Sequence, residues 1–265
     1  MAASHVDAAC RWLRGYEKNP KDRRFRFTSA GSVLPFFSSL YVLEELARDP
    51  APPPVFPYLA KTGNKQACPI HAVKNAGRKL ELVIHPFGPS QPVVVRGPDG
   101  QQLADVRVQE VPSHRSRVRR IVVPAAHRPG TYRVSLGPVP FLVIGGNAEK
   151  LVFSCPQGAR LGTPRRGHFV HARGKPYYFR VPRAKKSFAL ELSEPVTLRD
   201  PSGEMVRAVA GRKGRLEIPV AGRAGLWSFV AGNQTFVKFE GVPPVVAFGE
   251  PGRFFLPDEV RAQPH

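Results

Sequence analysis

The sequence contains few of the residues that build small metal-bound or disulfide-rich proteins. It holds only three cysteines, Cys10, Cys68 and Cys155, which lie far apart and form no C-x-x-C pair. A domain held together by zinc or by several disulfides needs more closely spaced ligands, so these classes are excluded. Cys68 and Cys155 could still pair in an oxidising compartment. Free cysteine usually behaves as a small buried apolar residue, so buried thiols are the favoured expectation.

Long apolar runs are also missing. The most apolar stretch, residues 33–43, is shorter than the roughly 20 apolar residues that span a bilayer. It begins too late for a secretory signal, which lies within about the first 15–30 residues. The chain as written is therefore expected to have neither a membrane span nor an export signal and to be cytoplasmic. A secreted or cell-surface location is expected only if Met1 is not the natural start.

Acidic residues are scarce relative to basic ones. Lys and Arg number 40 against 20 Asp and Glu, which gives a formal net charge of +20 at pH 7. This excess favours an anionic partner, such as an acidic polysaccharide, a cell-surface polymer or nucleic acid. The basic residues are scattered along the chain, and scattered charge also serves solubility. Composition alone therefore leaves both interpretations open.

Recognisable catalytic motifs are absent from the sequence. It contains no G-x-S-x-G elbow, no P-loop, no G-x-G-x-x-G and no H-E-x-x-H. Glycoside hydrolysis needs two carboxylates across a cleft, whereas Asp99 and Asp200 fall in predicted turns. We expect no catalytic residue, no metal site and no cofactor, and a non-enzyme is favoured.

The first part of the chain has helical patterns. Apolar spacing predicts a helix over residues 4–16 and a second over about 33–47, within an N-terminal segment of residues 1–48. A Pro-rich linker over residues 49–66 follows. Proline fixes φ and removes an amide donor, so this linker is expected to be extended and to mark a domain boundary.

Beyond the linker the apolar residues alternate, and turns become frequent. The chain holds 24 Gly and 29 Pro, which suits short strands joined by turns. One pattern occurs twice: residues 92–106 read PVVVRGPDGQQLADV, and residues 195–209 read PVTLRDPSGEMVRAV. A strand, a P-x-G turn and a returning strand cannot bury their own apolar face. Each copy is therefore expected to belong to a larger β-sandwich.

The spacing of the two copies supports a repeat. The turn residues correspond at a numbering difference of 103, whereas Pro124 and Gly130 match Pro219 and Gly225 at a difference of 95. The first copy therefore has a longer loop before Pro124. The predicted fold is mainly β, with two tandem immunoglobulin-like or jelly-roll-like β-sandwiches after the short N-terminal helical segment. The expected bounds are 67–147 and 148–247 for the sandwiches and 248–265 for a C-terminal tail.

The clearest binding signal interleaves basic and aromatic residues over residues 165–180. Its candidate ligand-binding residues are Arg165, Arg166, Phe169, Arg173, Lys175 and Tyr178. Aromatic faces stack on sugars or bases while Arg and Lys contact anionic groups. Tyr177 and Phe179 share the opposite strand face from Tyr178, so at least one of these aromatic residues is expected in the core. Trp227 lies in an alternating strand and is expected in the core or at an edge packed under a loop.

A second basic stretch lies in the longer loop of the first copy. If it is extended, Arg115, Arg117 and Arg119 line one face and could contact phosphates or sulfates. A charged edge strand that resists aggregation explains the pattern equally well.

The second copy carries several further motifs in order. They are KPYYFRVP, LRDPSG, GLWSF and a tail with GVPPVVAF followed by FFLPDEV, over about residues 150–260. This pattern resembles the β-sandwich modules at the C-terminal end of large bacterial secreted proteins, often beside glycoside hydrolase domains. The resemblance implies an accessory, glycan-contacting role and transfers no catalytic residue.

The sequence thus predicts a non-catalytic accessory or scaffold protein that binds an anionic glycan or cell-surface polymer. One alternative is a nucleic-acid-binding protein that uses its basic surface. Another is the C-terminal part of a glycoside hydrolase or other hydrolase. The oligomeric state is left open.

Overall fold

The structure is a computed structural model of the chain. It describes residues 58–61, 68–86, 92–113, 116–137, 139, 141–161, 176–207, 211–231 and 235–257. The two predicted helices lie outside these residues. The described part consists of antiparallel strands and one short 3₁₀ turn, η3 (Pro251–Arg253), so the predicted mainly β fold is confirmed. Within the described ranges, no helix is long and apolar enough to cross a membrane.

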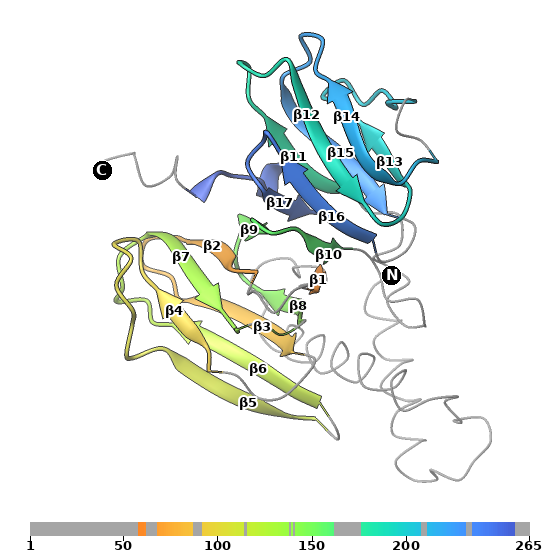
Figure 1. Ribbon diagram of the computed structural model, residues 1–265. Helices are drawn as coiled ribbons and strands as arrows, with labels where there is room; N and C mark the ends of the chain where they lie inside the picture. Colours follow the sequence, from red (N-terminus) through yellow and green to blue (C-terminus); the bar gives the residue numbers. More distant parts are fainter. Residues whose placement is uncertain are drawn as a thin grey trace, which may run out of the picture.

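The strands fall into two repeats in chain order (Figure 1). The first repeat contains β1 (Tyr58–Lys61), β2 (Ile70–Lys74), β3 (Leu80–Pro86), β4 (Val94–Arg96), β5 (Arg107–Ser113), β6 (Ser116–Val123), β7 (Gly130–Ser135), β8 (Phe141–Gly146) and β9 (Leu151–Ser154). The second contains β10 (Ala159–Leu161), β11 (Tyr177–Val181), β12 (Ser187–Leu192), β13 (Val196–Arg199), β14 (Gly214–Pro219), β15 (Gly225–Ala231), β16 (Thr235–Glu240) and β17 (Val245–Phe248).

Two sheets run through both repeats. The nine-stranded sheet has the order β14-β12-β16-β10-β1-β8-β3-β6-β5, and the eight-stranded sheet has the order β13-β15-β11-β17-β9-β2-β7-β4. Buried apolar side chains from both sheets form a core that extends through the two repeats. The boundary predicted near residue 148 falls between β8 and β9, and both sheets continue across it.

The two repeats use the same strand order. In the first repeat the sheets contain β1-β8-β3-β6 and β9-β2-β7-β4. In the second they contain β10-β16-β12-β14 and β17-β11-β15-β13. The longer loop predicted for the first copy contains β5, which pairs with β6 at the end of the nine-stranded sheet. The repeat seen in the sequence is thus a repeat of topology.

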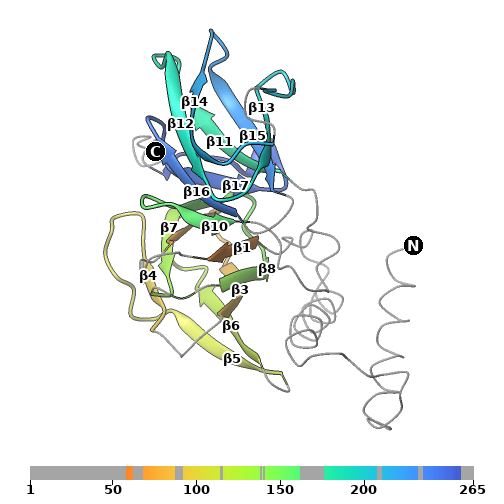
Figure 2. The same cartoon turned by 45° about the vertical axis from the view of Figure 1, so that its right-hand side comes forward.

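The repeats are joined by two antiparallel strand pairs, β1 with β10 and β9 with β17. Figure 2 shows β1 and β10 lying between the two halves of the molecule. Ala60 pairs with Phe141 of β8, and Leu161 pairs in the same way with Thr235 of β16. Ala60 also pairs with Leu161, so equivalent residues meet each other. The repeats are therefore related by an approximate two-fold axis through this joint.

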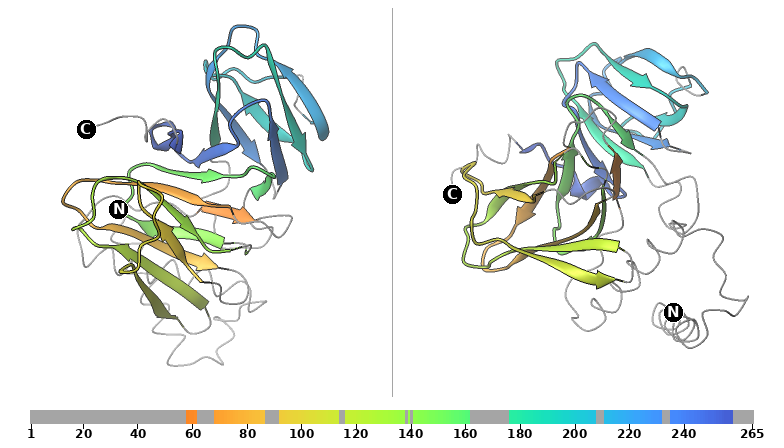
Figure 3. Two further views of the ribbon diagram at one scale, coloured as in Figure 1. Left: turned by 60° about the vertical axis from the view of Figure 1, so that its left-hand side comes forward. Right: turned by 60° about the horizontal axis from the view of Figure 1, so that its bottom comes forward.

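Alternation places the predicted core residues inside. Tyr177 and Phe179 are buried and Tyr178 between them is half-buried, as expected from their positions on β11. Trp227 on β15 is 0% exposed, so of its two predicted places it occupies the core. All four residues of β17 are buried, because η3 and the residues after it cover the outer side of the sheet there (Figure 3).

We expect the two repeats to unfold together, because they share both sheets. Differential scanning calorimetry of the full chain should show one main transition for the β-rich part, with equal calorimetric and van't Hoff enthalpies. Two separated transitions, or native-like behaviour of residues 148–265 expressed alone, would contradict the continuous architecture.

Candidate binding surface

Most of the candidate ligand-binding residues lie outside the described residues. These are Arg165, Arg166, Phe169, Arg173 and Lys175 of the 165–180 stretch, and Arg115 of the second basic stretch. Arg117 belongs to β6. Their assignment to a ligand surface stays a prediction.

Arg119 is placed inside the molecule. Its side chain is 7% exposed and lies 4.0 Å from a carboxylate oxygen of Glu110 on the neighbouring strand β5. Next to it, Arg120 donates a hydrogen bond of 2.7 Å to Glu81 on β3. The described part of this basic stretch is therefore engaged in ion pairs between strands, and Arg119 does not lie on an open face.

Tyr178 belongs to a small apolar cluster outside the main core. It packs with Val152, Val245, Ala247 and Phe255, where the C-terminal segment covers the joint between the repeats. Burial, and next the negative charge of Glu250, raises the pKa of the Tyr178 hydroxyl. The ring thus helps to hold the C-terminal segment against the sheet. The sequence did not reveal this contact, because a folded-back tail leaves no local pattern.

A row of side chains crosses the outer face of the eight-stranded sheet. On the second repeat, Arg199 of β13 lies opposite Ser228 of β15, and Ser228 lies opposite Tyr178 of β11. On the first repeat, the equivalent row runs from His71 of β2 through Arg133 of β7 to Arg96 of β4. Each row ends in an arginine on the outermost strand of the sheet. The row of the first repeat contains a second arginine, Arg133, and the row of the second repeat has Ser228 in its place.

Arg96 and Arg133 face one another on neighbouring strands. Both are exposed, and with Val94, Gly100 and Ser135 they line an open hollow. Arg96 donates a hydrogen bond of 3.0 Å to the carbonyl oxygen of Gly100. Among the described residues, no carboxylate forms an ion pair with either guanidinium. Like charges directly opposite each other on antiparallel strands repel, so this pair favours an anion between them.

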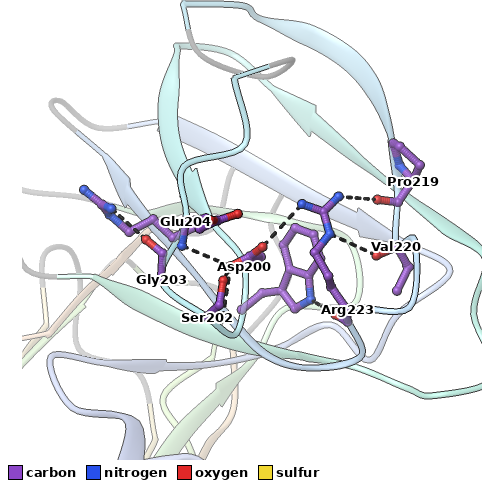
Figure 4. Close-up of polar contacts among 9 residues, drawn as sticks. Asp200, Ser202, Gly203, Glu204, Pro219, Val220 and Arg223 are labelled. Atoms are coloured by element: carbon purple, nitrogen blue, oxygen red, sulfur yellow. Dashed lines mark hydrogen bonds and ion pairs between the residues drawn. The ribbon is translucent and has the colours of Figure 1, made fainter.

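The turn of the second copy is held by a buried carboxylate (Figure 4). Asp200 is 3% exposed. Its Oδ1 accepts hydrogen bonds from the amide and hydroxyl of Ser202, at 3.0 and 2.6 Å, and from the amide of Glu204, at 3.0 Å. Its Oδ2 lies 3.3 Å from Nη1 of Arg223, which also sits over the Trp227 ring at 5.6 Å. Asp200 therefore joins the turn to the start of β15.

The surroundings of Asp200 keep it ionised. Burial acts to raise its pKa, but the hydrogen bonds from Ser202, Glu204 and Arg223 outweigh burial and leave the pKa lowered. Both carboxylate oxygens are occupied by these donors. Asp200 is thus a structural anion, in agreement with its predicted place in a turn.

The first copy uses the same arrangement with one change. Tyr132 donates a hydrogen bond of 2.7 Å to the carbonyl oxygen of Arg128, as Trp227 does to that of Arg223 at 2.7 Å. Arg128 pairs with Asp99 at 3.1 Å. The carboxylate therefore sits two positions later in this turn, and its side chain is 42% exposed. The repeated motif encodes a turn fixed to the opposite strand.

Most other carboxylates in the described ion pairs are likewise paired with basic side chains of the same protein. The acidic residues that pair with a nearby Arg or Lys include Glu81, Glu110, Glu191, Glu240 and Glu250. Asp105 lies within hydrogen-bonding distance of Nε2 of His127, at 2.8 Å. No group of three or more His, Cys, Asp or Glu side chains that could hold a metal ion occurs in the part of the chain that the structure describes.

Comparison with known proteins gives no relative: no protein-family model, curated protein or solved structure matches this chain. The function is therefore argued from the geometry of the described residues.

Replacing Asp200 with Ala should lower the free energy of unfolding by about 2–4 kcal/mol, because it leaves Arg223 and two amides without their buried acceptor. The matched variant Asp99→Ala removes a solvent-exposed ion pair and should cost less than ~1 kcal/mol. Urea unfolding of both variants measures the difference. Equal losses would show that the buried turn has no special weight.

The same carboxylate should make stability depend on pH. The folded-state pKa of Asp200 lies below its unfolded value, so its contribution is complete above the unfolded value of about 3.9 and is lost as pH falls through the folded pKa. Unfolding free energies from pH 6 down to about pH 2 should therefore fall more steeply for the natural chain than for Asp200→Ala. Parallel curves would contradict this assignment.

Proposed function

We propose that this protein is a non-catalytic accessory module that binds an anionic glycan or cell-surface polymer through the outer face of its eight-stranded sheet. The observation that carries the proposal is the Arg96–Arg133 pair. Two exposed guanidinium groups on paired strands share one hollow without a carboxylate partner among the described residues.

The chemistry of this pair suits sulfate or carboxylate groups. Directly opposed Cβ atoms on antiparallel strands lie about 4.5–5.5 Å apart. A tetrahedral sulfate or a planar carboxylate can therefore accept hydrogen bonds from both side chains. The guanidinium fork favours such two-pronged contacts more than an ammonium group does.

The exposed part of this row lies at the sheet edge. Strands of a sheet lie about 4.8 Å apart, so Arg133 and Arg96 on neighbouring strands span about one sugar-sized step, whereas His71, the next residue of the row, is buried. The described residues leave this hollow open. The apolar cluster around Tyr178 and the C-terminal segment occupies the centre of the sheet, so we assign the polymer path to the first repeat.

Nucleic acid is the second candidate, favoured only by net charge. Binding of single strands depends on exposed aromatic rings that stack on bases. On the described surface the large exposed apolar residues are Val108 and Met205, neither of which is aromatic. Nucleic-acid binding through these residues would rest on charge alone and would weaken steeply with salt.

Arg133→Ser should weaken binding of a sulfated or carboxylated polysaccharide about tenfold, equivalent to about 1.4 kcal/mol. Serine is the residue that the second repeat has at the equivalent position, Ser228, so the sheet should accept it. Affinity is measured with the full chain against sulfated, carboxylated and neutral polysaccharides and single-stranded DNA, at about 50 and 150 mM salt.

Arg183→Ser is the control. Arg183 is an exposed turn residue of the second repeat, and its loss changes the net charge equally. Retained binding of one anionic glycan at the higher salt, reduced by Arg133→Ser and not by Arg183→Ser, supports the proposal. Equal losses in both variants, or capture of every polyanion at low salt only, would overturn it.

A further inference from the structure

Two of the three cysteines meet at the joint between the repeats. Cys68 lies just before β2 and Cys155 just after β9, and both are buried, at 4% and 1% exposure. They are free thiols, as the sequence favoured, and their sulfur atoms lie 3.8 Å apart. This is a van der Waals contact between two nucleophilic groups that are 87 positions apart in the chain.

Strand register explains why these two residues meet. In the β2–β9 pair, Ile70 lies opposite Phe153, and the amide of Ser154 donates a hydrogen bond of 3.0 Å to the carbonyl oxygen of Pro69. One step further along this register, Cys68 lies opposite Cys155. Because the neighbouring pair carries the hydrogen bond, the cysteines occupy a non-hydrogen-bonded position.

The backbone at such a position is compatible with a disulfide. Cα atoms of a non-hydrogen-bonded pair lie about 4.5 Å apart, and their side chains are closer than in the alternate pairs. Disulfides bridge Cα atoms about 4.4–6.8 Å apart. The sulfur atoms can thus approach bonding distance by side-chain rotation, while the strands keep their pairing.

The second repeat has a different pair at this position. The amide of Gly249 donates a hydrogen bond of 2.9 Å to the carbonyl oxygen of Pro176, which matches the Ser154–Pro69 contact. The residues equivalent to Cys68 and Cys155 are therefore Lys175, outside the described residues, and Glu250. At this register position the first repeat has two thiols, and the second repeat has two residues of opposite charge.

We propose that Cys68 and Cys155 are the site of an intramolecular disulfide, formed by exchange with a small disulfide such as oxidised glutathione. The thiolate of one cysteine attacks the small disulfide, forms a mixed disulfide and releases one small thiol. The other cysteine then loses its proton and attacks the sulfur of the first, releasing the second small thiol. Two protein thiols are oxidised, and the small disulfide gains two electrons and two protons.

The two thiols influence each other's titration. Contact with Cys155 lowers the pKa of Cys68, although burial acts in the opposite direction. Contact with Cys68, and next burial, raises the pKa of Cys155.

The bond would strengthen the joint between the repeats. The amide of Cys155 donates a hydrogen bond of 2.7 Å to the carbonyl oxygen of Pro244, directly before β17. A Cys68–Cys155 bond therefore links β2 to the β9–β17 pair that joins the two halves. It also closes a long chain segment and so restricts the unfolded state.

The test uses the full chain, incubated in mixtures of oxidised and reduced glutathione and then alkylated under denaturing conditions. We expect two of the three thiols to be lost and peptide mass spectrometry to find residues 68 and 155 cross-linked. The Tm should rise by roughly 5–10 °C, and a reductant should reverse the rise. Three free thiols after incubation near the Tm, or cross-links that involve Cys10, would overturn the proposal.

Two variants separate this bond from general oxidation. Cys10→Ser should keep both the cross-link and the rise in Tm, and Cys155→Ser should lose both. If Cys155→Ser does not fold, the peptide map of the natural chain decides on its own, because it identifies the linked residues directly.

Discussion

The structure depends on backbone hydrogen bonding between the inner strands of the two repeats. β1 and β9 of the first repeat would otherwise be edge strands, as would β10 and β17 of the second. Unpaired edge strands expose rows of amide and carbonyl groups, which invite aggregation. Because these strands pair across the approximate two-fold axis, four edges become the interior of two continuous sheets. β17 takes part in this pairing, and the C-terminal segment covers its outer side at the same joint.

The proline of the repeated turn is in close contact with a glycine in both repeats. Gly130 and Gly225 both have positive φ, at 135° and 137°. A Cβ atom at Gly130 would lie 2.8 Å from Cγ of Pro98, and one at Gly225 would lie 3.2 Å from that of Pro201. The proline of each turn thus packs against the glycine that begins β7 or β15. Proline and glycine recur together because the proline ring occupies the space that a side chain at the glycine would need.

Sequence patterns predicted what depends on local chemistry. Alternation identified the strands and placed Tyr177 and Phe179 on the strand face opposite Tyr178, and the turn motifs were located by Pro and Gly. The continuity of the sheets could not be predicted, because an inner strand and an edge strand of the same composition look alike. The burial of Arg119 and the packing of Tyr178 depend on partners distant in the chain. Much of the 165–180 stretch lies outside the described residues, so that part of the candidate site stays a prediction.

The extra strand β5 gives the duplicated molecule a direction. Without it, the nine-stranded sheet would end in β6 on one side and in the equivalent β14 on the other, so both ends would present the same strand of the repeat. With it, one end presents Arg107, Val108, Gln109 and Glu110, all exposed, and the opposite end presents β14. A partner that binds an end of this sheet therefore meets a different strand, β5 or β14, in each half of the protein. The two repeats share one strand order, and β5 adds to the first an outer edge strand that has no counterpart among the described strands of the second.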